Sequence, residues 1–291
     1  MMMTPRSCAF ARFSATNLVA LTTLLATSVA ANAAELASAW SEGKPETKSR
    51  LIAGTTAGKV MAAVEIQLAD GWKTYWRFPG DGGGVPPTFD WEKSENVASV
   101  RVLYPQPKRF ADKAGDTLGY KGLAVFPVVI EPKDAAKPVS LKLMLEYGIC
   151  REVCVPVEAA LAVDVPVTGA AELPAEVLAA IDHVPRLGQN VRANDPKLVK
   201  VEAKLDGAAP SLAIEAEFPG GTASADAYIE SPEGFYIPLP KTGSATDVGK
   251  NRLRFEIDLT GAVDPADIKG KDAKVTLVSD QGLSETTFKL E

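Results

Sequence analysis

The run Val139-Ser-Leu-Lys-Leu-Met-Leu-Glu-Tyr147 carries an apolar or aromatic side chain at every second position. Because successive side chains of a β-strand point to opposite faces, this period predicts a strand with one buried face. A second apolar run, 157–165, follows after a short gap, and we expect the two runs to form a hairpin. The gap contains Cys150 and Cys154, which therefore lie on the hairpin connection.

The same β texture extends over both halves of the chain. Other short runs rich in β-branched, aromatic and aliphatic residues lie at 59–68, 72–78, 97–104 and 123–130 in the first half, and at 198–205, 212–218, 225–230, 235–239, 252–259, 274–279 and 285–290 in the second. Turn residues separate them about every ten positions. This pattern predicts an all-β fold of two tandem β-sandwich domains.

The two halves are joined by a segment of different composition. Residues 173–183 predict a short helix with Pro174 in its first turn, and a polar stretch with Pro185 and Gly188 follows. We therefore expect one domain at 40–168, a linker with a short helix at 169–196, and a second domain at 197–291.

The first 33 residues have the pattern of a secretory signal peptide. Arg6 and Arg12 precede an almost entirely apolar or small stretch, 18–30, and Ala31-Asn-Ala33 offers small residues for cleavage. This stretch is too short for a membrane span, and no later segment approaches about 20 consecutive apolar residues. We expect a protein that is exported to the periplasm, loses its leader together with Cys8, and does not itself span the membrane.

Charge and side-chain inventory exclude several classes of function. With 31 basic and 37 acidic side chains the chain has a formal net charge of −6, so nucleic acid is not an expected partner. The chain has one histidine, His183, far along the sequence from the thiols, which leaves too few ligands for zinc and no base for a hydrolase. We expect no cofactor and no bound metal as part of the main function.

Cys150 and Cys154 are the thiols that remain after the leader, and three residues separate them. In a fully extended chain their Cα atoms would stand about 13 Å apart, whereas a disulfide needs at most about 6.8 Å, so the loop must curl. A bridge over so short a loop contributes only about 2 kcal/mol, which favours a redox pair over a structural cross-link. Both remain open, as does Cu(I) binding with Met144 as a third ligand.

A set of motifs resembles a known family. They are Gly71-Trp-Lys-Thr-Tyr-Trp-Arg-Phe-Pro-Gly-Asp-Gly-Gly-Gly-Val-Pro-Pro87, Tyr104-Pro-Gln-Pro-Lys-Arg-Phe110, Gly119-Tyr120, Phe126-Pro127 and Tyr147-Gly-Ile-Cys150 to Cys154-Val-Pro156. Over residues 45–167 they are similar to the N-terminal periplasmic domain of the DsbD and ScsB family of thiol:disulfide interchange proteins. The three-residue spacer and the second sandwich are closer to the ScsB branch.

The resemblance implies an immunoglobulin-like sandwich and a thiol:disulfide oxidoreductase without a thioredoxin fold. In that family the cysteine pair takes electrons from a membrane-embedded hub and reduces periplasmic thiol proteins, including disulfide isomerases and proteins of cytochrome c maturation or copper tolerance. Neither a hub nor a thioredoxin-like domain follows the second half of this sequence, so we expect the hub to be a separate protein. The alternatives are a Cu(I)-binding or copper-tolerance protein, or a non-catalytic adaptor with a structural disulfide.

The resemblance also suggests roles for individual residues. It favours Cys154 as the attacking thiol and Cys150 as the resolving one. Phe110, in the turn that begins at Arg109, matches the aromatic residue with which the family caps its cysteines. Tyr120 and Tyr147 are further candidates, whose hydroxyl groups would hydrogen-bond to a thiolate unless they only pack in the core.

Overall fold

Strands β10 (Val139–Cys150) and β11 (Cys154–Val165) form a long antiparallel hairpin in this computed structural model. The structure describes residues 36–42, 44–166 and 171–291, and the expected signal peptide lies outside them. Along β10 the odd-numbered side chains from Val139 to Ile149 are buried, and the even-numbered ones are mostly not. The predicted strand with one buried face is therefore confirmed, and the hairpin extends up to both cysteines.

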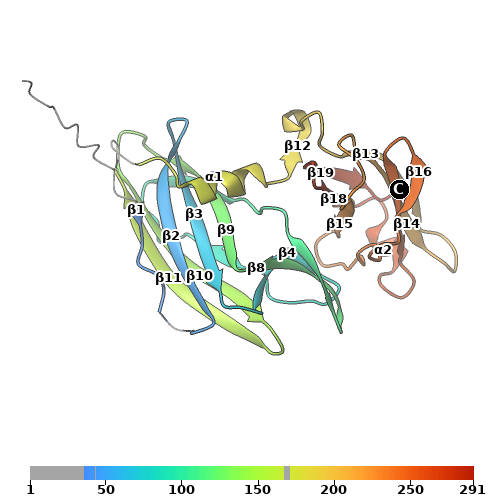
Figure 1. The fold of residues 1–291 in the computed structure, drawn as a ribbon, viewed down its shortest axis with the longest axis horizontal. Coiled ribbons are helices and arrows are strands. Elements are labelled where there is room, and N and C mark those ends of the chain that lie inside the picture. The colour runs from blue at the N-terminus through green and yellow to red at the C-terminus, as the bar shows by residue number, and fades with distance from the viewer. Residues whose placement is uncertain (1–35, 43, 167–170) are drawn as a thin grey trace, which may run out of the picture. The chain divides into compact units, whose positions relative to one another are not determined.

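The first sandwich consists of two antiparallel sheets. One has the order β1-β2-β3-β9-β6, formed by Leu36–Ala37, Thr47–Thr56, Lys59–Leu68, Leu123–Pro132 and Val97–Val102. The other has the order β11-β10-β4-β8-β7, and its further strands are Lys73–Gly80, Gly115–Lys121 and Lys108–Asp112, with β5 (Thr88–Asp90) paired to β10. Figure 1 shows β2, β3 and β9 side by side.

The core of this sandwich lies between the two sheets. It is built from alternate side chains of both, among them Leu51, Val64, Phe126, Leu141 and Ile149. Burial of such apolar area is the main force that holds the sheets face to face. The cysteine hairpin therefore projects from a rigid scaffold.

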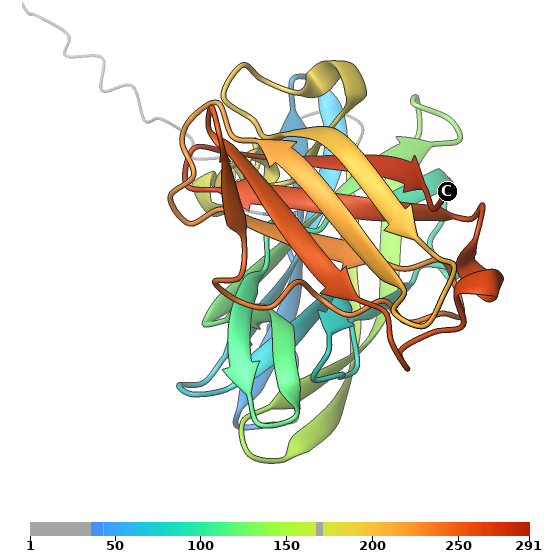
Figure 2. The ribbon, with the colours of Figure 1, turned by 90° about the vertical axis from the view of Figure 1, so that its right-hand side faces the viewer.

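The second sandwich also has two sheets. The orders are β12-β19-β18-β15 and β13-β14-β17-β16. These strands are Arg186–Leu187, Gly282–Lys289, Asp272–Ser279 and Asp226–Glu230 in the first sheet, and Lys197–Lys204, Ser211–Glu217, Arg252–Asp258 and Thr246–Gly249 in the other. In Figure 2 the yellow and orange strands of one sheet cross in front of the red strands of the other. A short helix, α2 (Pro265–Ile268), packs Ile268 into the core between them.

The structure differs from the sequence-based prediction at 235–239, which is not a strand. Ile237 and Leu239 are buried there, as their apolar character requires, but the segment lies outside every sheet. Pro238 and Pro240 lack the N–H group that a sheet ladder needs, so burial occurs without strand pairing. The predicted runs do not include β1, β2, β5, β7, β8, β12 and β16, because these strands are short or lack an uninterrupted apolar run.

The junction is tied to both sandwiches. The predicted short helix is present as α1 (Ala175–Asp182), and its Val177 is buried with Leu173 against Met61 and Ala63 of β3. Within the expected linker, β12 pairs in parallel with β19. The described part of the linker, 171–196, is therefore held by both sandwiches, while the domain boundaries themselves stay a prediction.

The sandwiches also contact each other directly, and residues 33–291 form one unit. Trp76 and Leu118 of the first sandwich pack with a cluster of side chains from the second, namely Tyr228, Leu239, Val278 and Leu283. Beside this cluster, Arg77 pairs with Glu230 and Glu285. None of the helices in the described ranges is long and apolar enough to cross a membrane.

Candidate active site

A disulfide between Cys150 and Cys154 closes the end of the β10–β11 hairpin. The two residues are directly opposed in the strand register, and their Cα atoms are 4.1 Å apart. The expected curl is therefore present, and the three residues between the cysteines make it. Cys154 is exposed and Cys150 half-buried, while Val153 in the turn is 70% exposed. A second macromolecule can therefore approach the bridge from the Cys154 side.

The hydroxyl group of Tyr75 contacts the disulfide at Cys154. It lies on β4, its side chain is almost fully buried, and its hydroxyl group is 3.3 Å from Sγ of Cys154. Burial, together with the negative charge of Asp112, raises the pKa of Tyr75, so the hydroxyl keeps its proton at neutral pH. Tyr75 can therefore donate a hydrogen bond to a thiolate at position 154.

The position of the Tyr75 ring depends on a close approach of the backbone at Gly84. A Cβ atom at residue 84 would overlap the ring, and the backbone there has φ +146°, a conformation that other residues rarely adopt. The sequence motif from Gly71 to Pro87 contains Tyr75 without assigning it a role. It did not indicate contact with a cysteine 79 residues further along the chain.

Phe110 lies beside a hollow that also contains Cys150. The hollow has a volume of about 350 Å³, and its lining consists of Gly71, Lys73, Arg109, Phe110, Ala111, Asp112, Lys121, Cys150 and Arg151. The ammonium group of Lys121 is 4.6 Å from the centre of the Phe110 ring, within the range of a cation–π contact. The structure thus brings Phe110 together with the cysteine pair.

An ion pair between the buried Lys73 and the more exposed Asp112 lies in the lining of this hollow. Lys73 pairs with Asp112, and Thr117 donates a 2.6 Å hydrogen bond to the same carboxylate. Although burial raises it, the bonds from Lys73 and Thr117 lower the pKa of Asp112 overall. Because Asp112 is charged at neutral pH, the network fixes β7 and β8 to β4.

The polar groups of the other three candidates bind partners other than the cysteines. The Tyr120 hydroxyl group donates a 2.8 Å bond to the Pro105 carbonyl oxygen. Tyr147 is buried in the core with its hydroxyl group 3.0 Å from Oγ1 of Thr47, on the opposite sheet face from Cys150. Arg109 also lines the hollow of Cys150, but its guanidinium group binds Asp226 of the second sandwich.

The residues near the bridge do not form a metal cluster. In the ranges that the structure describes, no group of three or more His, Cys, Asp or Glu side chains is placed to hold an ion. Met144 lies six positions before Cys150 on β10, about 20 Å along the strand, so it is too far away to share an ion with the cysteines. His183 lies beyond α1, with Nδ1 2.8 Å from the Ala179 carbonyl oxygen.

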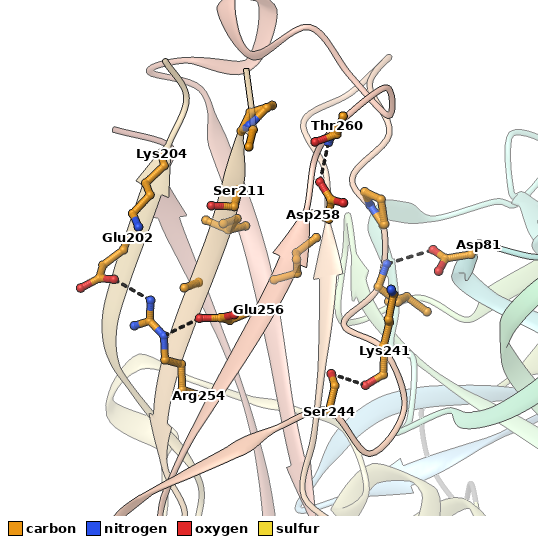
Figure 3. Close-up of a pocket in the computed structure, with 17 residues that line it drawn as sticks. Asp81, Glu202, Lys204, Ser211, Lys241, Ser244, Arg254, Glu256, Asp258 and Thr260 are labelled. Atoms are coloured by element: carbon orange, nitrogen blue, oxygen red, sulfur yellow. Dashed lines mark hydrogen bonds and ion pairs between the residues drawn. The ribbon is translucent and has the colours of Figure 1, made fainter. Parts of the chain in front are cut away.

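A larger hollow, about 630 Å³, lies mainly on the second sandwich (Figure 3). Its most prominent charge is Arg254, which pairs with Glu202, Glu215 and Glu256. The bonds from Lys200 and Arg254 lower the pKa of Glu202 to about 2. These opposite charges satisfy each other, so the candidate chemistry of the chain stays with the disulfide.

The fold and the site define a class of protein, an immunoglobulin-like β-sandwich with a disulfide at the end of an exposed hairpin. Residues 44–166 match the family described as "Thiol:disulfide interchange protein DsbD, N-terminal". This segment is therefore similar to the family that the sequence motifs indicated. A search of curated proteins finds no match.

Two solved structures are similar to this chain to different degrees. The N-terminal periplasmic domain of ScsB from Proteus mirabilis is similar with a TM-score of 0.66 and 23% identity, over 88% of this chain and 99% of that one. The reduced N-terminal domain of DsbD from Neisseria meningitidis matches with a TM-score of 0.26 and 16% identity, over 39% of this chain and 82% of that one. The first match spans both sandwiches and so confirms the all-β fold.

Replacing Tyr75 by phenylalanine is expected to slow the reaction of Cys154. The variant keeps the ring in its place against Gly84 but loses the hydroxyl group that lies 3.3 Å from the sulfur atom. A hydrogen bond to a charged group contributes about 1.5–3 kcal/mol, so we expect alkylation of the reduced Cys154 at pH 7 to fall about tenfold. Rates with iodoacetamide, followed by mass spectrometry, measure this, and Tyr147→Phe is the control. Equal rates in the wild type and Tyr75→Phe would show that the hydroxyl group has no role.

Proposed function

We propose that this protein is a thiol:disulfide exchange module of the periplasm. A separate membrane-embedded protein supplies the electrons, and periplasmic thiol proteins receive them. The observation that carries the proposal is the position of the bridge, which closes a very short loop at an exposed hairpin end with Cys154 facing solvent. The family match over 44–166 and the leader-like first 33 residues support it.

The exchange would proceed in two steps. In the reduced protein the Cys154 thiolate attacks one sulfur atom of a partner disulfide, the partner's S–S bond breaks, and the other partner sulfur leaves as a thiolate. The Cys150 thiolate then attacks Sγ of Cys154 in the mixed disulfide and releases the second partner thiolate. Two electrons have then passed to the partner, and the Cys150–Cys154 bridge is formed again.

The surface around the bridge indicates what a partner would meet. Val153 and Val85 are 70% and 56% exposed, and Arg151 and Lys121 beside them are exposed cations. Exposed apolar side chains rimmed by charge are typical of transient protein contacts. A thiol protein with an acidic side chain next to its own cysteines would complement this surface.

The Cys150→Ser variant is expected to accumulate a mixed disulfide with a partner, because the resolving thiol is absent. The adduct should be isolated from exporting cells on non-reducing gels, and the Cys154→Ser variant should give far less of it. The reduction potential of the wild-type pair should lie between about −180 and −270 mV, the range of exchange proteins. A potential below about −300 mV and no adduct in Cys150→Ser would instead indicate a structural bridge.

A further inference from the structure

The hairpin of β7 and β8, residues 108–121, presents two different faces. Successive residues of a strand point to opposite sides, and Phe110 and Arg109 follow this rule. Both residues line the hollow of Cys150, but the Phe110 ring contacts Lys121 there, whereas the Arg109 guanidinium group binds Asp226 of the second sandwich. Whatever fixes Arg109 therefore also fixes the strand that carries Phe110.

Arg109 is held by a dense set of contacts. Its Nε and Nη2 atoms donate bonds of 2.8 and 2.7 Å to the two carboxylate oxygens of Asp226 on β15. Its Nη1 atom donates to the Pro240 carbonyl oxygen and to Asp116, both at 3.0 Å. The guanidinium group lies 5.6 Å from the ring centre of Tyr228, and the side chain is only 9% exposed. A bidentate, desolvated pair of this kind fixes geometry as well as adding energy.

The same surface of the second sandwich contacts the hairpin and the neighbouring turn at further points. Thr242 donates a 2.8 Å bond to Asp116 of β8. Asp81, in the turn after β4, accepts bonds from the Leu239 backbone and the Tyr236 hydroxyl group, and Figure 3 shows the first of these. The segment that failed to form a strand, 235–239, and the residues that follow it thus supply part of this support.

We propose that the second sandwich positions Phe110 and so controls access to the bridge from the Cys150 side, through the clamp between Arg109 and Asp226. This inference rests on the proposed function, because access to the cysteines matters only if they exchange disulfides with a partner. Arg109 is a positioning residue, because it touches neither sulfur atom and acts through the strand that it shares with Phe110. The second sandwich thereby gains a role in the exchange reaction without any reactive group of its own.

The test compares two acidic residues of the same strand. Asp226→Asn weakens the clamp on the hairpin, while Glu230→Gln weakens the matching pair with Arg77, which lies on β4 and not on the hairpin. Reduction of the bridge by dithiothreitol, which becomes its cyclic disulfide as Cys150 and Cys154 become thiols, is timed in the full chain. We expect the rate to rise about fivefold to tenfold in Asp226→Asn and to stay within about twofold of the wild type in Glu230→Gln.

A double variant shows whether the clamp acts through Phe110. Phe110→Ala alone should speed the reduction, and adding Asp226→Asn to it should change nothing further, because the group that the clamp positions is gone. Hydrogen exchange at 108–121 should quicken in Asp226→Asn alone. If Asp226→Asn fails to fold, Arg109→Lys tests the same clamp from the first sandwich and should give the same increase.

Two results would overturn the inference. One is an equal rate of reduction in the wild type, Asp226→Asn and Arg109→Lys, and the other is an increase of the same size in the Phe110→Ala background. Neither result bears on whether the pair exchanges disulfides with partners, since the Cys150→Ser adduct tests that separately. Conversely, if Cys150→Ser gives no adduct, the measured reduction rates still decide whether the clamp controls access.

Discussion

Gly119→Ala is expected to destabilise the protein by at least about 3 kcal/mol, because this glycine allows two strands to approach closely. Gly119 lies on β8 directly opposite Tyr75 of β4. A Cβ atom there would overlap the carbonyl oxygen of Thr74 and lie 3.1 Å from Cα of Tyr75. Since these are backbone atoms, relief would require β8 to move away from β4, which would displace the hairpin that carries Phe110.

Urea unfolding of Gly119→Ala measures the loss, and Gly122→Ala is the matched control. Gly122 follows the same strand with φ +72° and open space where a Cβ atom would lie, so its replacement should cost only about 1 kcal/mol. The variant at 119 should also react faster with dithiothreitol if it folds. Similar losses of stability in the two variants would mean that β4 and β8 can separate enough to accept a Cβ atom at residue 119.

Trp76→Ala should cost about 3–5 kcal/mol and weaken the association of the two sandwiches. Trp76 is fully buried on β4 and packs on Tyr228 edge to face, with ring centres 6.0 Å apart. Its cluster includes Leu239, Val278 and Leu283 of the second sandwich, so truncation would leave a cavity between the sandwiches. We expect the two sandwiches to unfold in separate steps in this variant.

The Trp76→Phe variant distinguishes the loss of apolar packing from the loss of the indole N–H group. The indole Nε1 atom has no hydrogen-bond partner among the described residues, so removing it sacrifices no bond, and phenylalanine keeps most of the apolar contact. We expect a loss below about 1.5 kcal/mol for Trp76→Phe and one cooperative transition. Calorimetry that gave a single transition for Trp76→Ala as well would argue against a role of this cluster in joining the sandwiches.

Part of the candidate site could be read from the sequence. The cysteine spacing and the flanking apolar runs were enough to place Cys150 and Cys154 at the end of one hairpin, because hairpins form between neighbours in the chain. The motif around Phe110 indicated a residue beside the pair, and the structure places it at the same hollow. The sequence motifs offered Tyr120 and Tyr147 as partners of a thiolate, whereas both hydroxyl groups bind elsewhere.

The sequence alone determined the all-β class, the two halves, the α1 helix and the cysteine hairpin, because period, turn residues and short spacing act over a few residues. Tertiary structure decided that Tyr75 contacts Cys154 and that Arg109 binds Asp226 of the other sandwich. Those contacts join residues 79 and 117 positions apart. Such pairs follow from strand order and from the packing of whole sheets, neither of which has a local pattern in the chain.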